Sequence, residues 1–146
     1  MEYRRLGSSG LKVSVLSYGS WVTFGNQVNV DNAVECLKTA YDGGVNFFDN
    51  AEAYADGQSE IVMGKALRKL GFARDSYAVS SKVFFGAAGE PKPTQRGLSR
   101  KHVFEACHQA LERLQVDYLD LYFCHRPDPQ TPIEETVWAM HQLIMQ

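Results

Sequence analysis

The stretch Val45-Asn-Phe-Phe-Asp-Asn-Ala-Glu-Ala-Tyr54 decides the fold of this chain. An apolar run from Val45 to Phe48 stops at a carboxylate, Asp49, and a phenol follows at Tyr54. A short apolar run bounded by turn-forming residues is typical of a buried strand. The stretch therefore predicts a strand that ends on an acid, followed by a loop that carries a proton donor.

Two later apolar runs also end on an ionisable side chain. The strand predicted over 77–81 runs into Lys82, and the strand predicted over 118–124 runs into His125. Strands that alternate with helices predict a parallel sheet under a helical cover, so acid, amine and imidazole should meet at one end of that sheet. Helical periodicity lies before, between and after these strands, over 31–42, 59–70, 99–114 and 131–146.

Local signals mark where the helices begin. Ser59 is the expected N-cap of the second helix, and Ser99 is expected to start the third. Thr131 and Glu134 form the capping box expected at the start of the fourth helix. The Gly- and Pro-containing loop over 86–97 has no clear pattern.

The N-terminal residues predict a hairpin. Extended pieces at 3–6 and 12–16 flank the turn-forming cluster Gly7-Ser-Ser-Gly10. A first core strand is predicted over 16–21, where it leads into a loop. The complete order is therefore a hairpin followed by four strand–helix units in a single domain.

Two closures fit this order. An open, doubly wound sheet suits a chain of 146 residues. The first four units of a (β/α)8 barrel would give the same order, although that fold needs about 250 residues. Doubly wound nucleotide binders usually carry a Gly-rich turn, and neither G-x-G-x-x-G nor a P-loop occurs here. Length favours the open sheet, whereas the gathering of polar groups at strand ends favours the barrel.

The composition excludes several classes of function. A net charge of −2 gives no strong attraction to nucleic acid or anionic lipid. No apolar run reaches the roughly 18 residues that membrane insertion needs. The three cysteines form neither a disulfide framework nor a zinc motif, and we expect them to be buried in a cytoplasmic protein: Cys36, Cys107 and Cys124. No metal site is predicted, and the helical histidines are expected near the surface: His102, His108 and His141.

The four ionisable groups suggest a chemistry when they are taken together. A free phenol titrates at about 10, and a nearby ammonium group favours the phenolate. Asp49 would fix Lys82 beside Tyr54, and His125 could hold a carbonyl oxygen. The set would polarise a C=O bond and protonate its oxygen, while a nicotinamide cofactor supplies the hydride. Each residue alone also has a structural interpretation, as a turn cap, a loop aromatic or a solvated charge.

Six segments, in order over nearly the whole chain, carry a resemblance to a known family: 3–14, 21–25, 48–54, 96–102, 111–115 and 126–129. The chain resembles the aldo-keto reductases. More narrowly, it is similar to the subgroup that contains the β subunits of voltage-gated potassium channels and their bacterial relatives. The resemblance implies a (β/α)8 barrel whose base is plugged by the N-terminal hairpin.

The resemblance also implies NADPH-dependent reduction of an aldehyde or ketone. The family's catalytic positions correspond to Asp49, Tyr54 as proton donor, Lys82 and His125. The segment with Ser20, Trp21 and Gln27 would lie beside NADP(H), and Asp49 and His125 would border the nicotinamide and the small carbonyl substrate. The channel β subunits carry asparagine where this chain has His125, which argues for the enzymatic relatives and against a channel partner.

Residues 1–146 would then be the N-terminal half of such a reductase domain, an incomplete barrel that stops inside its fourth helix. The second half would supply most of the cofactor contacts, so we expect this truncated chain to be inactive alone. Two alternatives stay open. One is a redox-sensing, channel-associated binding module. The other is a non-catalytic half-barrel, stable as a homo-oligomer of two copies or with a completing fragment.

Overall fold

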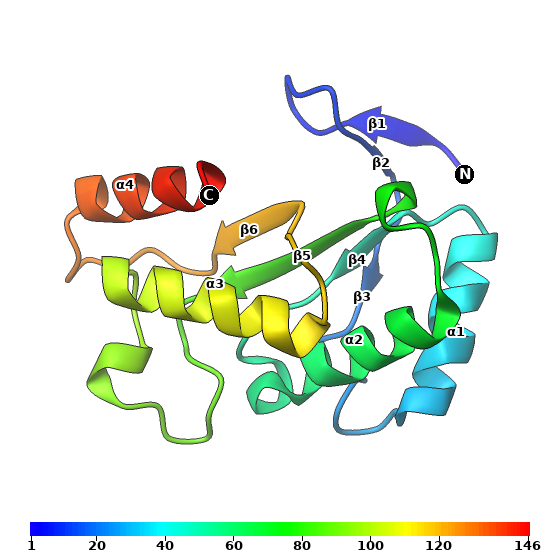
Figure 1. Ribbon diagram of the computed structural model, residues 1–146, viewed down its shortest axis with the longest axis horizontal. Helices are drawn as coiled ribbons and strands as arrows, with labels where there is room; N and C mark the ends of the chain where they lie inside the picture. The colour runs from blue at the N-terminus through cyan, green and yellow to red at the C-terminus, as the bar shows by residue number, and fades with distance from the viewer.

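Four parallel strands form the centre of the molecule in the computed structural model, which describes all 146 residues (Figure 1). They are hydrogen-bonded in chain order: β3 (Tyr18–Gly19), β4 (Phe47–Asp49), β5 (Ala78–Val83) and β6 (Leu121–Cys124). One helix follows each strand: α1 (Val30–Asp42), α2 (Gln58–Leu70), α3 (Arg100–Leu114) and α4 (Ile133–Ile144). Short 3-10 turns at 54–57, 74–76 and 93–95 complete the connections.

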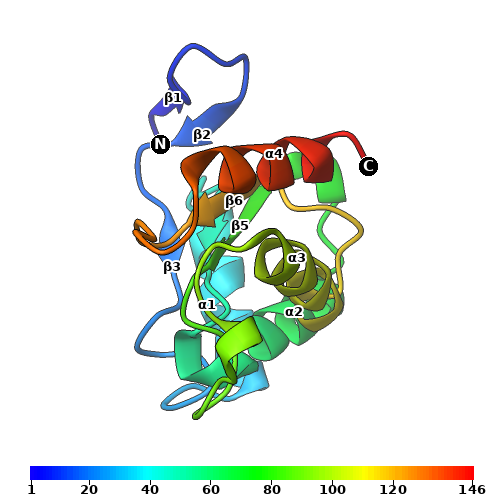
Figure 2. The same cartoon turned by 90° about the vertical axis from the view of Figure 1, so that its left-hand side faces the viewer.

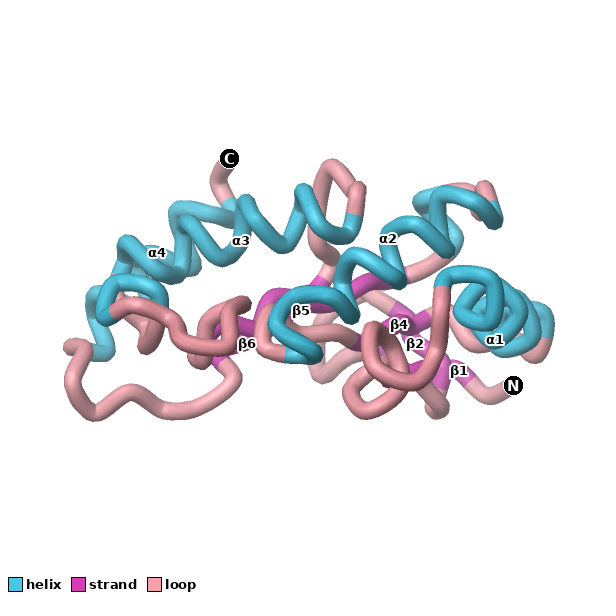
Figure 3. Tube along the Cα trace, turned by 90° about the horizontal axis from the view of Figure 1, so that it is seen from below, coloured by secondary structure: helices cyan, strands magenta, loops and turns pink.

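The strand order decides between the two closures. In a doubly wound sheet the order of strands reverses at a switch point. Here the order runs one way, and the helices follow in the same order along the strands, from α4 beside β6 to α1 (Figure 3). Consecutive helices also contact one another. The chain is therefore an α/β fold with the arrangement of a partial barrel, as the placement of the polar groups predicted.

The predicted hairpin lies at the N-terminal end of the sheet. Its strands β1 (Tyr3–Arg5) and β2 (Lys12–Ser14) pair antiparallel and stand apart from the helices (Figures 1 and 2). The Ser14 N–H donates to Asn46 Oδ1 at 2.7 Å, just before β4 begins. Since Asp49 ends that strand, the hairpin and the carboxylate lie at opposite ends of the sheet.

Apolar side chains fill the space between the strands and the helices. The larger cluster joins strands to α1, α2 and the end of α3: Phe24, Ala33, Leu37, Phe48, Met63, Ala66, Leu67, Tyr77, Val79 and Leu114. A smaller cluster lies under α3 and α4: Val83, Leu98, Val103, Ala106 and Ala139. The helices are thus held by burial of their apolar faces, which predicts that tight helix contacts are sensitive to added volume.

Gly64 of α2 lies at a close contact between α2 and the end of α3. A Cβ atom there would lie 2.6 Å from the backbone oxygens of Arg113 and Leu114, at the end of α3. We expect Gly64→Ala to lower the free energy of unfolding by about 1–3 kcal/mol, because backbone would have to move. Gly10→Ala is the control, since nothing lies within 4 Å of that position. Urea unfolding measures both, and equal stabilities of the two variants would contradict this packing.

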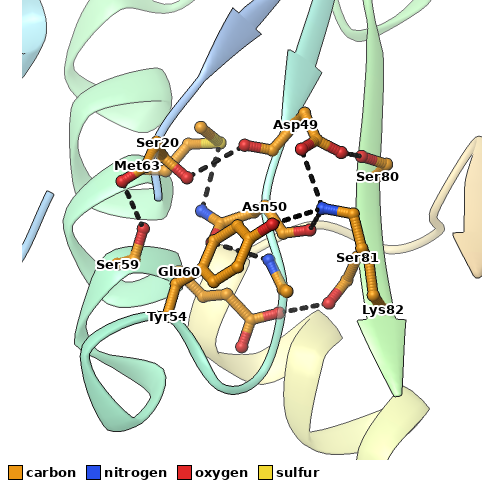
Figure 4. Close-up of polar contacts among 11 residues, drawn as sticks. Ser20, Asp49, Asn50, Tyr54, Ser59, Glu60, Met63, Ser80, Ser81 and Lys82 are labelled. Atoms are coloured by element: carbon orange, nitrogen blue, oxygen red, sulfur yellow. Dashed lines mark hydrogen bonds and ion pairs between the residues drawn. The ribbon is translucent and has the colours of Figure 1, made fainter. Parts of the chain in front are cut away.

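β5 sends alternate side chains to opposite faces of the sheet. Ser81 points toward the helices, where its hydroxyl donates to Glu60 Oε1 of α2 at 2.6 Å (Figure 4). Arg113 Nε of α3 donates to the other oxygen of Glu60 at 2.6 Å. Burial nevertheless raises the pKa of Glu60. Ser80 and Lys82 point to the opposite face, where both bind Asp49.

Several expected boundaries differ from the structure. Asp49 and Lys82 lie inside β4 and β5 rather than after them. β6 begins only at Leu121, because the Tyr118 carbonyl and the Asp120 carboxylate are bound by Arg74.

Two of the three predicted helix starts were also wrong. α2 starts at Gln58 after Gly57, and Ser59 is buried in its first turn. Thr131 donates its hydroxyl to Asp128 at 2.7 Å and leaves the start of α4 uncapped, whereas Ser99 does cap α3.

Two burial predictions were wrong as well. Cys124 is exposed at the end of β6, because β6 is one of the two edge strands of the sheet, and Cys36 and Cys107 are only partly buried. His102 is 4% exposed rather than at the surface. None of the four helices is long and apolar enough to cross a membrane.

Candidate active site

Lys82 is the centre of a polar cluster at the C-terminal ends of the strands (Figure 4). Its ammonium group has three N–H donors, and each one finds an oxygen. Nζ donates to Asp49 Oδ2 at 2.7 Å, to the Asn50 carbonyl at 2.7 Å and to the Tyr54 hydroxyl at 2.9 Å. The amine of Lys82 is thus fixed between the Asp49 carboxylate and the Tyr54 phenol, as the sequence predicted.

Asp49 is held from two sides by β5. Its second oxygen accepts the Ser80 hydroxyl at 2.7 Å, while Oδ2 accepts Lys82. The side chains of Asp49 and Lys82 remain 26% and 15% exposed, so the ion pair lines an open surface rather than the core. A charge pair at the rim of the sheet can act on a bound molecule.

Tyr54 reaches this pair from a strained turn. The two residues after it, Ala55 and Asp56, have positive φ values of 50° and 53°. Such conformations are costly for residues other than glycine and persist where the surroundings enforce them. Because Lys82 donates to the phenol oxygen, the O–H proton of Tyr54 is free to point toward another acceptor.

His125 completes the cluster from β6. Its backbone N–H donates to the Val83 carbonyl at 3.0 Å, which extends the pairing of β5 and β6. The imidazole meets Tyr54 and Phe85 edge-on, at centroid distances of 5.9 and 5.3 Å. Its Nδ1 atom is buried without a hydrogen-bond partner. The structure therefore brings all four predicted side chains to one place.

Burial lowers the pKa of His125 below its ordinary value of 6.5, and the charges of Lys82 and Arg126 lower it further. The unfolded chain then binds the proton more readily, so stability is full above about pH 6.5 and falls as the pH drops toward the folded-state pKa. We expect an NMR titration to give a value below 6.5 and the acid-side loss to shrink in His125→Asn. A value of 6.5 or more would contradict the burial of this ring.

The model of the aldo/keto reductase family matches residues 15–146. The chain belongs to the aldo/keto reductase family. This finding confirms the resemblance inferred from the six motifs.

Three curated relatives narrow the relationship within the aldo/keto reductases. A probable voltage-gated potassium channel subunit beta from Arabidopsis thaliana is 54% identical over 99% of this chain, which covers 43% of that protein. The rice protein of the same description, from Oryza sativa subsp. japonica, has the same identity and coverage. A putative subunit from Schizosaccharomyces pombe is 51% identical over 99% of this chain, and 42% of that protein is covered. The chain spans less than half the length of these relatives.

A solved structure supports the fold assignment. The crystal structure of a thermostable aldo-keto reductase in complex with the inhibitor epalrestat matches with a TM-score of 0.84 and 35% identity. The match covers all of this chain and half of that one. A complete aldo/keto reductase thus contains the present arrangement as part of its barrel.

The three residues expected to lie beside a cofactor differ in their exposure and in their contacts with the cluster. Trp21 is 67% exposed, and its indole stacks on the Tyr54 ring at a centroid distance of 6.1 Å. Ser20 is fully buried, and its hydroxyl donates to the Asp49 carbonyl at 2.9 Å. Gln27 is exposed in the loop before α1, with no hydrogen bond to the four-residue cluster. Trp21 alone of these three packs on a side chain of the cluster, whereas Ser20 binds only the Asp49 backbone.

Sequence reasoning missed a buried carboxylate behind the cluster. Glu52 is 2% exposed and accepts hydrogen bonds from Phe84 N–H and Gly86 N–H at 2.7 and 2.8 Å. His102 Nε2 lies 3.2 Å from the same oxygen. The available signal was an acid set between small residues, Ala51-Glu52-Ala53, directly after the strand. No group of His, Cys, Asp and Glu side chains could hold a metal ion.

Proposed function

We propose that this chain carries the reacting end of a carbonyl reductase site, in which Tyr54 protonates the oxygen of an aldehyde or ketone. One observation carries the proposal. The Tyr54 hydroxyl accepts from Lys82 Nζ at 2.9 Å, and the same ammonium is paired with Asp49 at 2.7 Å. The phenol keeps its own proton for a substrate, and the phenolate left behind would be stabilised by a charge already in contact with it.

Asp49 and His125 have supporting roles in this proposal. Asp49 holds the ammonium in position, so no rearrangement is needed when negative charge develops on Tyr54. The lowered pKa of His125, caused first by burial, keeps its imidazole neutral near pH 7. A neutral imidazole N–H can donate to the same carbonyl oxygen that Tyr54 protonates.

The residues present fit the reacting end of a nicotinamide cofactor. The exposed indole of Trp21 and the partly exposed Asp49 and His125 border one face of the cluster, and the buried Nδ1 of His125 lacks a partner. NADPH, when bound, supplies the hydride for the carbonyl carbon. Ser20 would act on the cofactor only through Asp49, whose carbonyl it binds. Gln27 would contact the cofactor from the loop before α1.

Turnover tests this proposal directly. NADPH oxidation in the presence of an aromatic aldehyde should be followed in the longest natural form of the protein that contains these residues, with NADH in parallel. We expect oxidation that depends on the aldehyde and is faster with NADPH. Addition of NADPH should also quench the fluorescence of Trp21, whose ring lies against Tyr54. Absence of any aldehyde-dependent oxidation by that protein would reject the function.

A channel-associated module is the second candidate. The descriptions of three relatives at 51–54% identity as potassium channel β subunits favour it. His125 weighs against it, because the resemblance places asparagine there in channel subunits. Co-purification with a channel cytoplasmic domain would support this candidate. No co-purification, together with aldehyde reduction, would leave the carbonyl reductase as the remaining candidate.

The three cysteines are all free, and we place the protein in a reducing, cytoplasmic compartment as part of the proposal.

A further inference from the structure

Glu52 connects the two segments that carry the reacting side chains. Its backbone N–H donates to the carbonyl of Lys82 at 3.2 Å. Two residues further along the chain, Tyr54 places its hydroxyl 2.9 Å from the amine of the same Lys82. The turn that carries the phenol is therefore anchored on the very residue that the phenol must meet.

The side chain of Glu52 extends this connection beyond β5. Its Oε1 atom accepts the N–H groups of Phe84 and Gly86, on either side of Phe85. Phe85 is the residue whose ring packs edge-on against the imidazole of His125. One carboxylate oxygen thus fixes the segment that covers His125, while the backbone of the same residue fixes the turn of Tyr54.

His102 of α3 supplies the third contact to this oxygen. Glu52 and His102 are 2% and 4% exposed, so the contact is shielded from water. Burial alone would raise the pKa of Glu52, but the bonds from His102, Phe84 and Gly86 outweigh it and the pKa is lowered. An ionised carboxylate only accepts hydrogen bonds, so Nε2 of His102 carries the proton.

We propose that Glu52 is a positioning residue for the reductase site, held by His102, which sets Tyr54 and His125 relative to Lys82 without touching the substrate. The inference rests on the proposed function for its kinetic consequence and on contacts alone for its structural one. A carboxylate that accepts three donors is worth more than a neutral acceptor, because charge-assisted bonds are stronger. Loss of these bonds would leave two backbone N–H groups without their partner and free Phe85 to move.

The kinetic test compares Glu52→Ala with Glu52→Gln, whose amide oxygen can still accept the two backbone N–H groups. We expect kcat to fall about 100-fold in Glu52→Ala, the effect of a displacement of about 1 Å, with KM changed less than about twofold. Glu52→Gln should recover most of that loss. Glu112→Ala on the exposed side of α3 is the control and should match the wild type. A fall in kcat as large in Glu52→Gln as in Glu52→Ala would contradict positioning by these bonds.

A second readout needs no turnover and separates this inference from the proposed function. Because burial is the main reason that the His125 pKa is low, loosening of Phe85 should raise it. NMR titration of Glu52→Asp, which keeps the carboxylate charge but withdraws its oxygen by one methylene, should therefore give a higher His125 pKa than in the wild type, even if the protein reduces no aldehyde. Glu52→Ala is unsuitable for this readout, because the Glu52 charge itself raises the His125 pKa and its loss would oppose the effect of a loosened Phe85. An unchanged His125 pKa in folded Glu52→Asp overturns the inference.

Discussion

Replacing Tyr54 with phenylalanine is expected to lower aldehyde-dependent NADPH oxidation by about 1,000-fold, the range of a lost general acid. The substitution removes only the hydroxyl that Lys82 contacts at 2.9 Å, and it keeps the ring that stacks with Trp21. The protein should therefore stay folded and still bind the cofactor. Steady-state kinetics should show the loss in kcat rather than in KM.

Tyr118→Phe is the matched control for this variant. Its ring receives the guanidinium of Arg74 at 3.9 Å, and its hydroxyl makes no hydrogen bond. We expect its turnover to equal that of the wild type. A Tyr54→Phe protein that reduces aldehydes as fast as the wild type would remove Tyr54 from the chemistry.

Replacing Lys82 with methionine is expected to lower turnover by about 100- to 1,000-fold, the usual effect of removing one preorganised donor. Methionine fills a similar volume but leaves Asp49 Oδ2, the Asn50 carbonyl and the Tyr54 oxygen without their shared partner. Unsatisfied groups of this kind also cost about 1–3 kcal/mol of stability. Kinetics and urea unfolding measure the two effects separately.

Lys101→Met is the control for the lysine variant. Lys101 is exposed on α3 and pairs only with Glu105, one turn along the same helix. Exposed pairs of this type contribute less than about 1 kcal/mol, so neither turnover nor stability should change measurably. Equal losses in the two lysine variants would mean that the cluster has no special role.

The pattern of the sequence predicted the order of elements because each strand and helix follows a simple periodicity. The apolar runs that end at Asp49, Lys82 and His125 needed no knowledge of long-range contacts. The choice between an open sheet and a barrel did need them, since it depends on which strand pairs with which. Predicted strand boundaries were wrong where a side chain binds backbone far away in the sequence. Arg74 donates to the Tyr118 carbonyl, and β6 begins only after this point, at Leu121.

The sequence predicted the ionisable side chains of the candidate site, but not the buried residues behind them. Strand ends place Asp49, Lys82 and His125 by topology alone, whereas Glu52 lies in an irregular loop with no period to identify it. His102 looked like a helix surface residue because its partner comes from a loop 50 residues away. Burial of the His102 side chain depends on how α3 packs over β5, and the local sequence pattern does not reveal this packing.

A double-mutant cycle on Tyr54 and Lys82, with aldehyde-dependent NADPH oxidation as the readout, tests most directly whether phenol and amine act together. If the two side chains act as one unit, the double variant should be within about threefold of the slower single variant. Losses that multiply, so that the double variant is slower by the product of the two single effects, would show that phenol and amine act independently and would contradict the account.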